Sequence, residues 1–128
     1  MAITKPTNTD LIRPLEGAVI RRFTVGTGGV TAGDIVSGST DGVITCDGNG
    51  VAAKVPVGMA MKTASAGEVV AVVTHGAVGG FTSTTLGAEI YPSDATPGLP
   101  SETASTNKYS VGVSLSASIV FVRVTYVA

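Results

Sequence analysis

The side chains that could do covalent or metal chemistry are few in this sequence. It contains one histidine, His75, and one cysteine, Cys46. A zinc site usually needs three or four His, Cys or carboxylate ligands, so acidic residues would have to join these two. A Cys–His nucleophile would need both side chains within hydrogen-bonding distance, and neither lies in a recognisable motif. We therefore predict a polar strand-end residue at His75 and a small strand-end residue at Cys46.

Three acidic residues recur in one local pattern. Asp34, Glu68 and Glu89 each follow two small residues and stand where a run of β-prone residues begins. A paired-carboxylate hydrolase would need two of them to face each other across a cleft, and the sequence leaves that alternative open. The repeated position favours a turn, in which the acid accepts a backbone N–H as the chain enters a strand.

No phosphate-binding loop can be read from the sequence. A P-loop needs the pattern GxxxxGK[ST], in which the lysine reaches the phosphates and the hydroxyl holds magnesium. Lys62-Thr63 follows Met61 rather than glycine, and the glycine-rich stretch 26–29 precedes no helical pattern. The sequence therefore predicts no cofactor, no metal and no catalytic residue, and it favours a protein that is not an enzyme.

The elements that would position these residues are almost all β-strands. Short runs of Val, Ile, Thr and Ala alternate with turn pairs such as Asp41-Gly42 and Asn49-Gly50, which tolerate the positive φ angles of tight hairpins. No segment has a clear helical period. We predict an all-β fold, a small β-barrel or β-sandwich of short strands and hairpins. The expected strands cover residues 18–25, 34–37, 42–46, 51–55, 58–62, 68–75, 89–91, 109–115 and 119–127.

The last expected strand has the clearest alternation of apolar and other residues. Successive side chains of a strand point to opposite faces, so the run predicts one apolar face. The two predicted faces are Val120, Val122, Val124 and Tyr126 on one side, and Phe121, Arg123 and Thr125 on the other.

Residues 1–17 have the composition of an extended N-terminal arm. They contain two prolines, several Thr and Asn residues, and no period of 2 or 3.6. Proline interrupts a strand ladder, and such a segment gains little from its own core unless a neighbouring surface holds it. We therefore divide the chain into an arm over residues 1–17 and a single β domain over residues 18–128. The polar stretch 92–108 is expected to form a long surface loop.

Composition and charge limit the class of partner. The chain has 128 residues, which suits one domain; 13% are charged and the formal net charge is −1. Near-neutral charge argues against a nucleic-acid partner, and the lack of a long apolar run argues against a membrane span or a signal peptide. Residues 1–25 differ from the rest, because they hold four basic and two acidic side chains against four and seven in residues 26–128.

The succession of motifs over residues 30–127 resembles a known family. It resembles the small capsid decoration (cement) proteins of tailed bacteriophages, and most closely the Ala/Gly/Val-rich family once labelled recombinase-like. The nucleotide loop that a recombinase would need is missing. The segments that carry the resemblance are 31–36 (TAGDIV), 57–60 (VGMA), 66–73 (AGEVVAVV), 86–91 (LGAEIY), 107–113 (NKYSVGV) and 120–124 (VFVRV).

The resemblance implies a structural virion protein without enzymatic activity. Such a protein would bind the outer surface of the assembled head, after synthesis in the host cytoplasm, and cement neighbouring subunits of the major capsid protein. It would also associate with itself, most often as a trimer at three-fold or quasi-three-fold positions. We expect the basic contact residues to pair with acidic side chains on the capsid surface. Deletion of residues 1–16 should weaken binding to the head while the rest of the domain stays folded. The expected contact residues are Ile3, Lys5, Pro6, Leu11, Ile12, Arg13, Pro14, Leu15, Arg21 and Arg22.

Two alternatives remain at the level of the sequence. One is another structural or adhesion module, such as a fibre base or a surface-layer domain. The other is a small carbohydrate-binding or hydrolytic β domain, which would need a deep pocket with convergent polar groups near His75 or Asp34.

Overall fold

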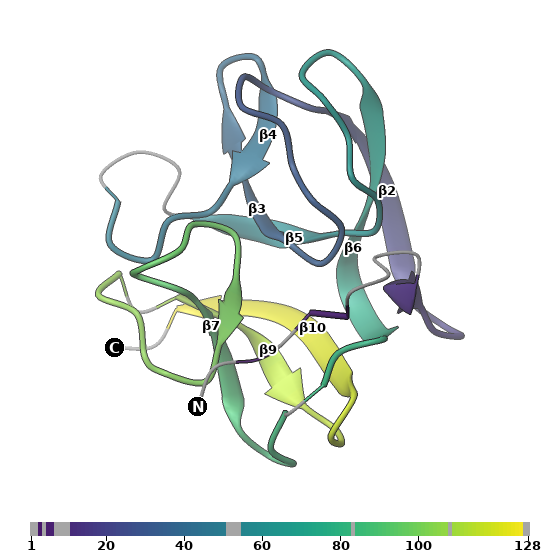
Figure 1. Ribbon diagram of the computed structural model, residues 1–128, viewed down its shortest axis with the longest axis vertical. Helices are drawn as coiled ribbons and strands as arrows, with labels where there is room; N and C mark the ends of the chain where they lie inside the picture. Colours follow the sequence, from purple (N-terminus) through teal and green to yellow (C-terminus); the bar gives the residue numbers. More distant parts are fainter. Residues whose placement is uncertain are drawn as a thin grey trace.

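The computed structural model describes residues 3, 5–6, 11–50, 55–82, 84–107 and 109–126. These residues form ten strands of one sheet and no α-helix, which confirms the all-β prediction (Figure 1). Accordingly, no helix able to cross a membrane is found among them. The strands are β1 (Arg13–Pro14), β2 (Val19–Thr24), β3 (Ile35–Ser39), β4 (Gly42–Thr45), β5 (Pro56–Ala60), β6 (Val69–Gly79), β7 (Glu89–Pro92), β8 (Pro100–Ser101), β9 (Tyr109–Ser114) and β10 (Ile119–Tyr126).

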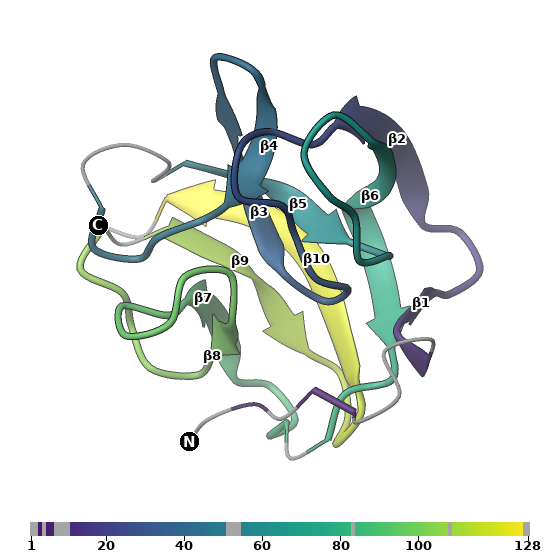
Figure 2. The same cartoon turned by 45° about the horizontal axis from the view of Figure 1, so that its top comes forward.

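The antiparallel sheet is organised around β6, its longest strand. The first part of β6 pairs with β2 on one edge and with β5 on the other. Its second part pairs with β1 on the same edge as β2, and with β10 on the same edge as β5. The path continues from β5 to β3 and β4, and from β10 to β9, β7 and β8. The sheet curls into a half-barrel, with β2 and the adjoining part of β6 at one side of the molecule (Figure 1, Figure 2).

The change of partners along β6 occurs at Gly76 and depends on glycine. Gly76 has a φ of 129°, a conformation that other residues rarely adopt, and a Cβ there would lie 2.6 Å from the Cα of Ala18. The register against β2 also shifts between Val19 and Ile20. Such irregularities bend and twist a strand. One continuous strand can therefore serve both parts of the sheet.

Two hydrophobic clusters fill the curled sheet, and β6 contributes to both. Val70 and Val72 belong to a small cluster made mainly of valine, while Val73 and Val78 belong to a larger cluster with bulkier side chains. Val72 and Val73 are neighbours and point to opposite faces, and the irregularity at Gly76 places Val78 in the same cluster as Val73. The small cluster contains Val25, Val30, Val36, Val43, Ala60, Val70 and Val72. The larger cluster contains Ile3, Ile12, Ala32, Ile35, Cys46, Met59, Met61, Val73, Val78, Phe81, Ile90, Val111, Val120 and Val122.

The outer edge of β4 is covered by the segment that follows β2. Val25 forms a parallel bridge with Val43, and the N–H of Gly26 donates to the carbonyl of Val43 at 2.8 Å. The carboxylate of Asp41 accepts the hydroxyl and the N–H of Thr27 at 2.7 and 3.1 Å. These hydrogen bonds, with one from Ser39, hold the pKa of Asp41 below its ordinary value. The edge of β4 is therefore closed by the chain itself.

Most strands lie where the runs of β-prone residues predicted them, with three differences. The strand expected over 68–75 continues to Gly79, because β6 passes through its irregularity instead of ending there. The loop expected over 92–108 includes β8, which pairs with β7. The strand expected over 51–55 lies outside the described residues except for Val55, which is not in a strand.

The apolar face predicted for the last strand is buried only in the first half of β10. Val120 and Val122 are fully buried, whereas Val124 is 38% exposed. The register against β9 shifts between Val122 and Thr125, and such a shift re-aims the side chains that follow it. The prediction that Val124 shares the buried face is therefore wrong.

The N-terminal segment packs into the body. Ile3 and Ile12 are only 2% and 3% exposed within the larger cluster, and Lys5 forms an ion pair with Asp34. Arg13 and Pro14 of this segment form β1, which pairs with β6. This packing differs from the expectation that residues 1–17 gain little from a core. Sequence periodicity missed it because the two buried isoleucines are far apart and follow no regular spacing. The expectation that the body stays folded after deletion of residues 1–16 remains a prediction.

Candidate interaction edge

The free edge of β2 is the part of the surface best suited to bind a partner. Among the described strands, β2 pairs with β6 alone, and its second edge is open from Val19 to Arg22, while Gly42 of β4 lies against the carbonyl of Thr24. The four residues from Val19 to Arg22 are all exposed, including the two aliphatic side chains at 43% and 44%. The strand lies at the periphery of the molecule (Figure 2). Both faces and one edge of this segment are therefore accessible.

Three arginines lie along the same side of β6. β1 and β2 follow one another along the edge of β6 that is opposite β10 and β5, and they carry Arg13, Arg21 and Arg22. All three side chains are exposed. The ion pairs found among the described residues are formed by other side chains. Positive charge on this edge is thus available to a partner.

Local packing holds β2 in place while leaving its first residues open. Phe23 is half-buried against the small valine cluster and lies opposite Val70 of β6. At the other end, Ala18 contacts the position of Gly76. The strand is therefore anchored at both ends, and the exposed segment between them is held extended by its hydrogen bonds to β6.

The structure brings together only part of the predicted contact set. The residues on or beside the free edge are Leu11, Arg13, Pro14, Leu15, Arg21 and Arg22. The remaining four, which lie elsewhere and are buried or half-buried, are Ile3, Lys5, Pro6 and Ile12. A buried side chain cannot contact a partner without leaving its place in the core, so Ile3 and Ile12 act in the fold. Lys5 and Pro6 are half-buried, and their contact with a partner stays a prediction.

Sequence reasoning missed Val19 and Ile20 as surface residues. It placed them in the first strand of the domain but gave these two residues no role at the surface. The available signal was their position directly before Arg21 and Arg22, since adjacent charges are unusual in a strand with both neighbours. The exposed aliphatic pair and the arginine pair together form one continuous segment.

The three recurring acids do not form a common site. Asp34 accepts the N–H of Thr31 at 2.8 Å and Glu68 accepts the N–H of Ser65 at 2.6 Å, which confirms the turn role at these two positions. Glu89 differs, because its carboxylate accepts the hydroxyl of Ser110 at 2.5 Å and a guanidinium N–H of β10. Each acid therefore has a structural partner of its own.

The cysteine and the histidine, whose side chains are best suited to metal or nucleophilic chemistry, each pack against other parts of the fold. Cys46 is fully buried, and burial, with a smaller contribution from Asp47, raises the pKa of its thiol to about 12. His75 is exposed within β6 and packs edge-on against Phe121, with ring centroids 5.1 Å apart. The prediction of a strand end at His75 is therefore wrong. In the described part of the chain, no group of three or more His, Cys, Asp or Glu residues could hold a metal ion.

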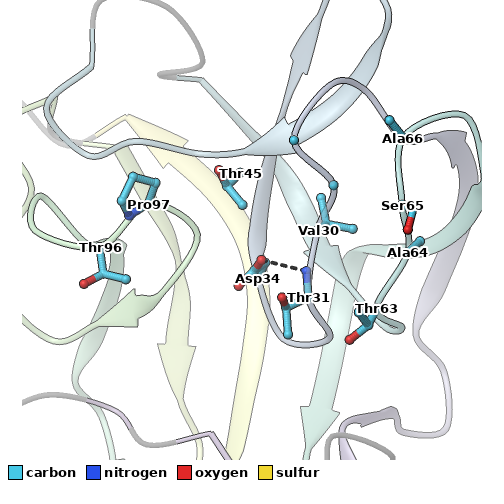
Figure 3. Close-up of a pocket in the computed structure, with 12 residues that line it drawn as sticks. Val30, Thr31, Asp34, Thr45, Thr63, Ala64, Ser65, Ala66, Thr96 and Pro97 are labelled. Atoms are coloured by element: carbon cyan, nitrogen blue, oxygen red, sulfur yellow. Dashed lines mark hydrogen bonds between the residues drawn. The ribbon is translucent and has the colours of Figure 1, made fainter.

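An open hollow of about 590 Å³ lies beside Asp34 (Figure 3). Hydroxyl side chains from several loops line it, together with small residues, and its lining contains no aromatic side chain. The Asp34 carboxylate is already engaged by the N–H of Thr31 and by Lys5. The hydroxyl side chains are those of Thr31, Thr45, Thr63, Ser65 and Thr96.

Comparisons of the chain with protein-family models, with curated proteins and with solved structures each find no match.

Proposed function

We propose that this chain is a structural binding protein that attaches to the outer surface of an assembled bacteriophage head and cements neighbouring subunits of the major capsid protein. The proposal joins the family resemblance of the sequence to one structural observation, the open basic edge at β2. An added strand gains main-chain hydrogen bonds along its length without requiring a deep pocket. Such an edge suits a protein whose partner is another protein surface.

A cement role requires many copies on one shell. Because each copy is held beside its neighbours, modest single contacts add up to strong attachment. We propose self-association as a trimer at three-fold or quasi-three-fold positions, with β2 directed toward the shell. Binding of the folded state to the shell would also stabilise the protein by mass action.

The experiment mixes purified protein with undecorated phage heads, pellets the heads, and images them by electron microscopy. Ordered density at symmetry-related positions on the outer surface is the expected result. Absence of the protein from heads of the matching phage, under conditions where the protein is folded, would overturn the cement role. Attachment to a fibre or to a cell envelope would support the other structural alternative.

The hollow beside Asp34 supports a second candidate, a carbohydrate-binding or hydrolytic domain. Its volume of about 590 Å³ and its hydroxyl lining would fit a polar ligand such as a sugar. It ranks second because the Asp34 carboxylate is occupied by Lys5 and Thr31. Titration with a panel of oligosaccharides, followed by nuclear magnetic resonance, tests it: specific shifts at Thr31 and Thr63 would support this function.

A further inference from the structure

We propose that the free edge of β2 accepts an extended acidic segment of the partner protein as an added antiparallel strand. In this arrangement two consecutive acidic residues of the partner lie opposite Arg22 and Arg21, and two apolar residues follow opposite Ile20 and Val19. The inference rests on the proposed binding function and names the chemistry of the segment that is bound.

The geometry of β2 suits strand addition. The strand is six residues long and contains no proline, so every residue can offer its N–H group to one side or the other. One side is used by β6. On the other side, the groups of Val19–Arg22 face away from the described strands, whereas the carbonyl of Thr24 lies against Gly42, the first residue of β4. An unpaired edge of this kind is a template for another strand.

A second copy of β2 is a poor occupant of this edge. If two copies pair in an antiparallel sense over the whole of Val19–Thr24, Arg21 of one lies opposite Arg22 of the other, and the reverse. Like charges directly opposite each other in a sheet are destabilising. The same arginines that repel a second copy attract a segment with acidic residues at those positions.

The order of the partner's residues follows from strand geometry. Neighbouring residues point to opposite faces, so Arg21 and Arg22 need an acid on each face and therefore two adjacent acids. An antiparallel partner runs from the position of Arg22 toward that of Val19. Its sequence, read from the N-terminus, is thus two acidic residues and then two residues that suit the exposed Ile20 and Val19, such as valine and isoleucine.

The binding test uses a fluorescent peptide that contains the sequence Thr-Thr-Glu-Glu-Val-Ile. Two control peptides contain Thr-Thr-Lys-Lys-Val-Ile, with the charge reversed, and Ile-Val-Glu-Glu-Thr-Thr, with the order reversed. Anisotropy should show binding of the first peptide at least about tenfold tighter than the lysine peptide. Hydrogen exchange at residues 19–22 should slow only with the first. Equal binding of the two glutamate peptides, or of all three, would overturn the proposal.

Charge-reversal variants locate the bound peptide. Arg22→Glu should weaken binding of the first peptide about tenfold, and the double variant R21E/R22E should prefer the lysine peptide. Lys62→Glu is a matched control, since this exposed lysine follows β5 on the opposite side of β6. It should change binding less than about twofold. Circular dichroism establishes that each variant is folded. An equal effect of Arg22→Glu and Lys62→Glu would contradict a site on β2.

The same variants separate this inference from the cement role. Binding of the peptide at β2 without attachment to heads would support the edge site and overturn the cement role. Attachment of the wild type and of R21E/R22E to heads with equal affinity would leave the cement role standing and overturn the edge site as its contact.

Discussion

Two edge strands of the sheet, β8 and β2, differ in how their edges are treated. β8 has two residues, and one of its two pairs joins Pro100 to Pro92, neither of which has an N–H to donate. β2 has six residues, no proline, and four consecutive exposed side chains. Short strands and prolines are common means of protecting an edge from unwanted pairing. The chain protects β8 in this way and leaves β2 accessible.

The outer edge of β4 adds a third case to the comparison. It is covered by the residues that follow β2, through the bridge between Val25 and Val43 and the hydrogen bonds of Thr27 with Asp41. Of these three edges, one is shortened, one is covered, and the edge of β2 is open and basic. The open edge is the one at which we propose binding, and the four predictions below test how it is supported and used.

The largest expected effect comes from Ile12, the arm residue buried in the larger cluster. Ile12→Ala should lower the free energy of unfolding by about 3 kcal/mol, because it leaves a cavity in the larger cluster. Leu11→Ala is the matched control, since Leu11 is 47% exposed, and it should cost less than about 1 kcal/mol. Urea denaturation measures both. Equal midpoints would contradict the integration of the arm into the core.

The next effect concerns the contact that positions the start of β2. Gly76→Ala should cost about 2 kcal/mol, because the new Cβ meets Ala18 and the φ of 129° disfavours alanine. Gly38→Ala, in β3, has open space around its Cβ position and should be neutral or slightly stabilising. Thermal unfolding of both variants is the measurement. A loss at Gly38 as large as at Gly76 would show that any added side chain in a strand is harmful.

Proline should convert the open edge into a protected one. The N–H groups of Ile20 and Arg21 point to opposite sides of β2, so only one is needed by β6. One of Ile20→Pro and Arg21→Pro should cost about 1 kcal/mol in stability, and the other should preserve stability while removing binding of the glutamate peptide. The alanine variants at each position are the controls. Retained binding of the glutamate peptide in the proline variant that keeps its stability would refute strand addition.

The smallest effect is a pH dependence at the covered edge. The fold lowers the pKa of Asp41 below its ordinary value of 3.8, so its contribution to stability is present above that value and is lost as the pH falls through the folded pKa. Urea denaturation at pH 6 and pH 3 should show a larger loss for the wild type than for Asp41→Asn. Identical losses would mean that the hydrogen bonds of Asp41 do not stabilise the fold.

The residue types in short stretches of the sequence predicted the strands and some of their turns well. Runs of valine and isoleucine followed by Asp-Gly predicted the hairpin of β3 and β4, because these residue types favour extended strands and tight turns wherever they occur. The turn role of Asp34 and Glu68 was also readable, since each acid accepts an N–H three residues before it. Glu89 escaped this reasoning because its partners, Ser110 and Arg123, are distant in the sequence.

The candidate site was only partly predictable. Arg21 and Arg22 were correctly placed in a strand, but Ile3 and Ile12 were assigned to a partner surface and lie in the core. Burial of two isolated isoleucines depends on where distant segments place an apolar cluster, and no periodicity reports it.

By itself the sequence determined that this chain folds as β-structure and where its basic residues cluster, because strand propensity, turn chemistry and charge are properties of neighbouring residues. Only the tertiary structure decided that β6 would serve two clusters, that the arm would fill one of them, and that β2 would keep a free edge. These features depend on pairing between segments tens of residues apart, such as Ile20 with Val73, and on the shift of register between Val19 and Ile20. Pairing of that kind is set by the packing of the whole sheet, because each strand can satisfy its backbone against more than one neighbour.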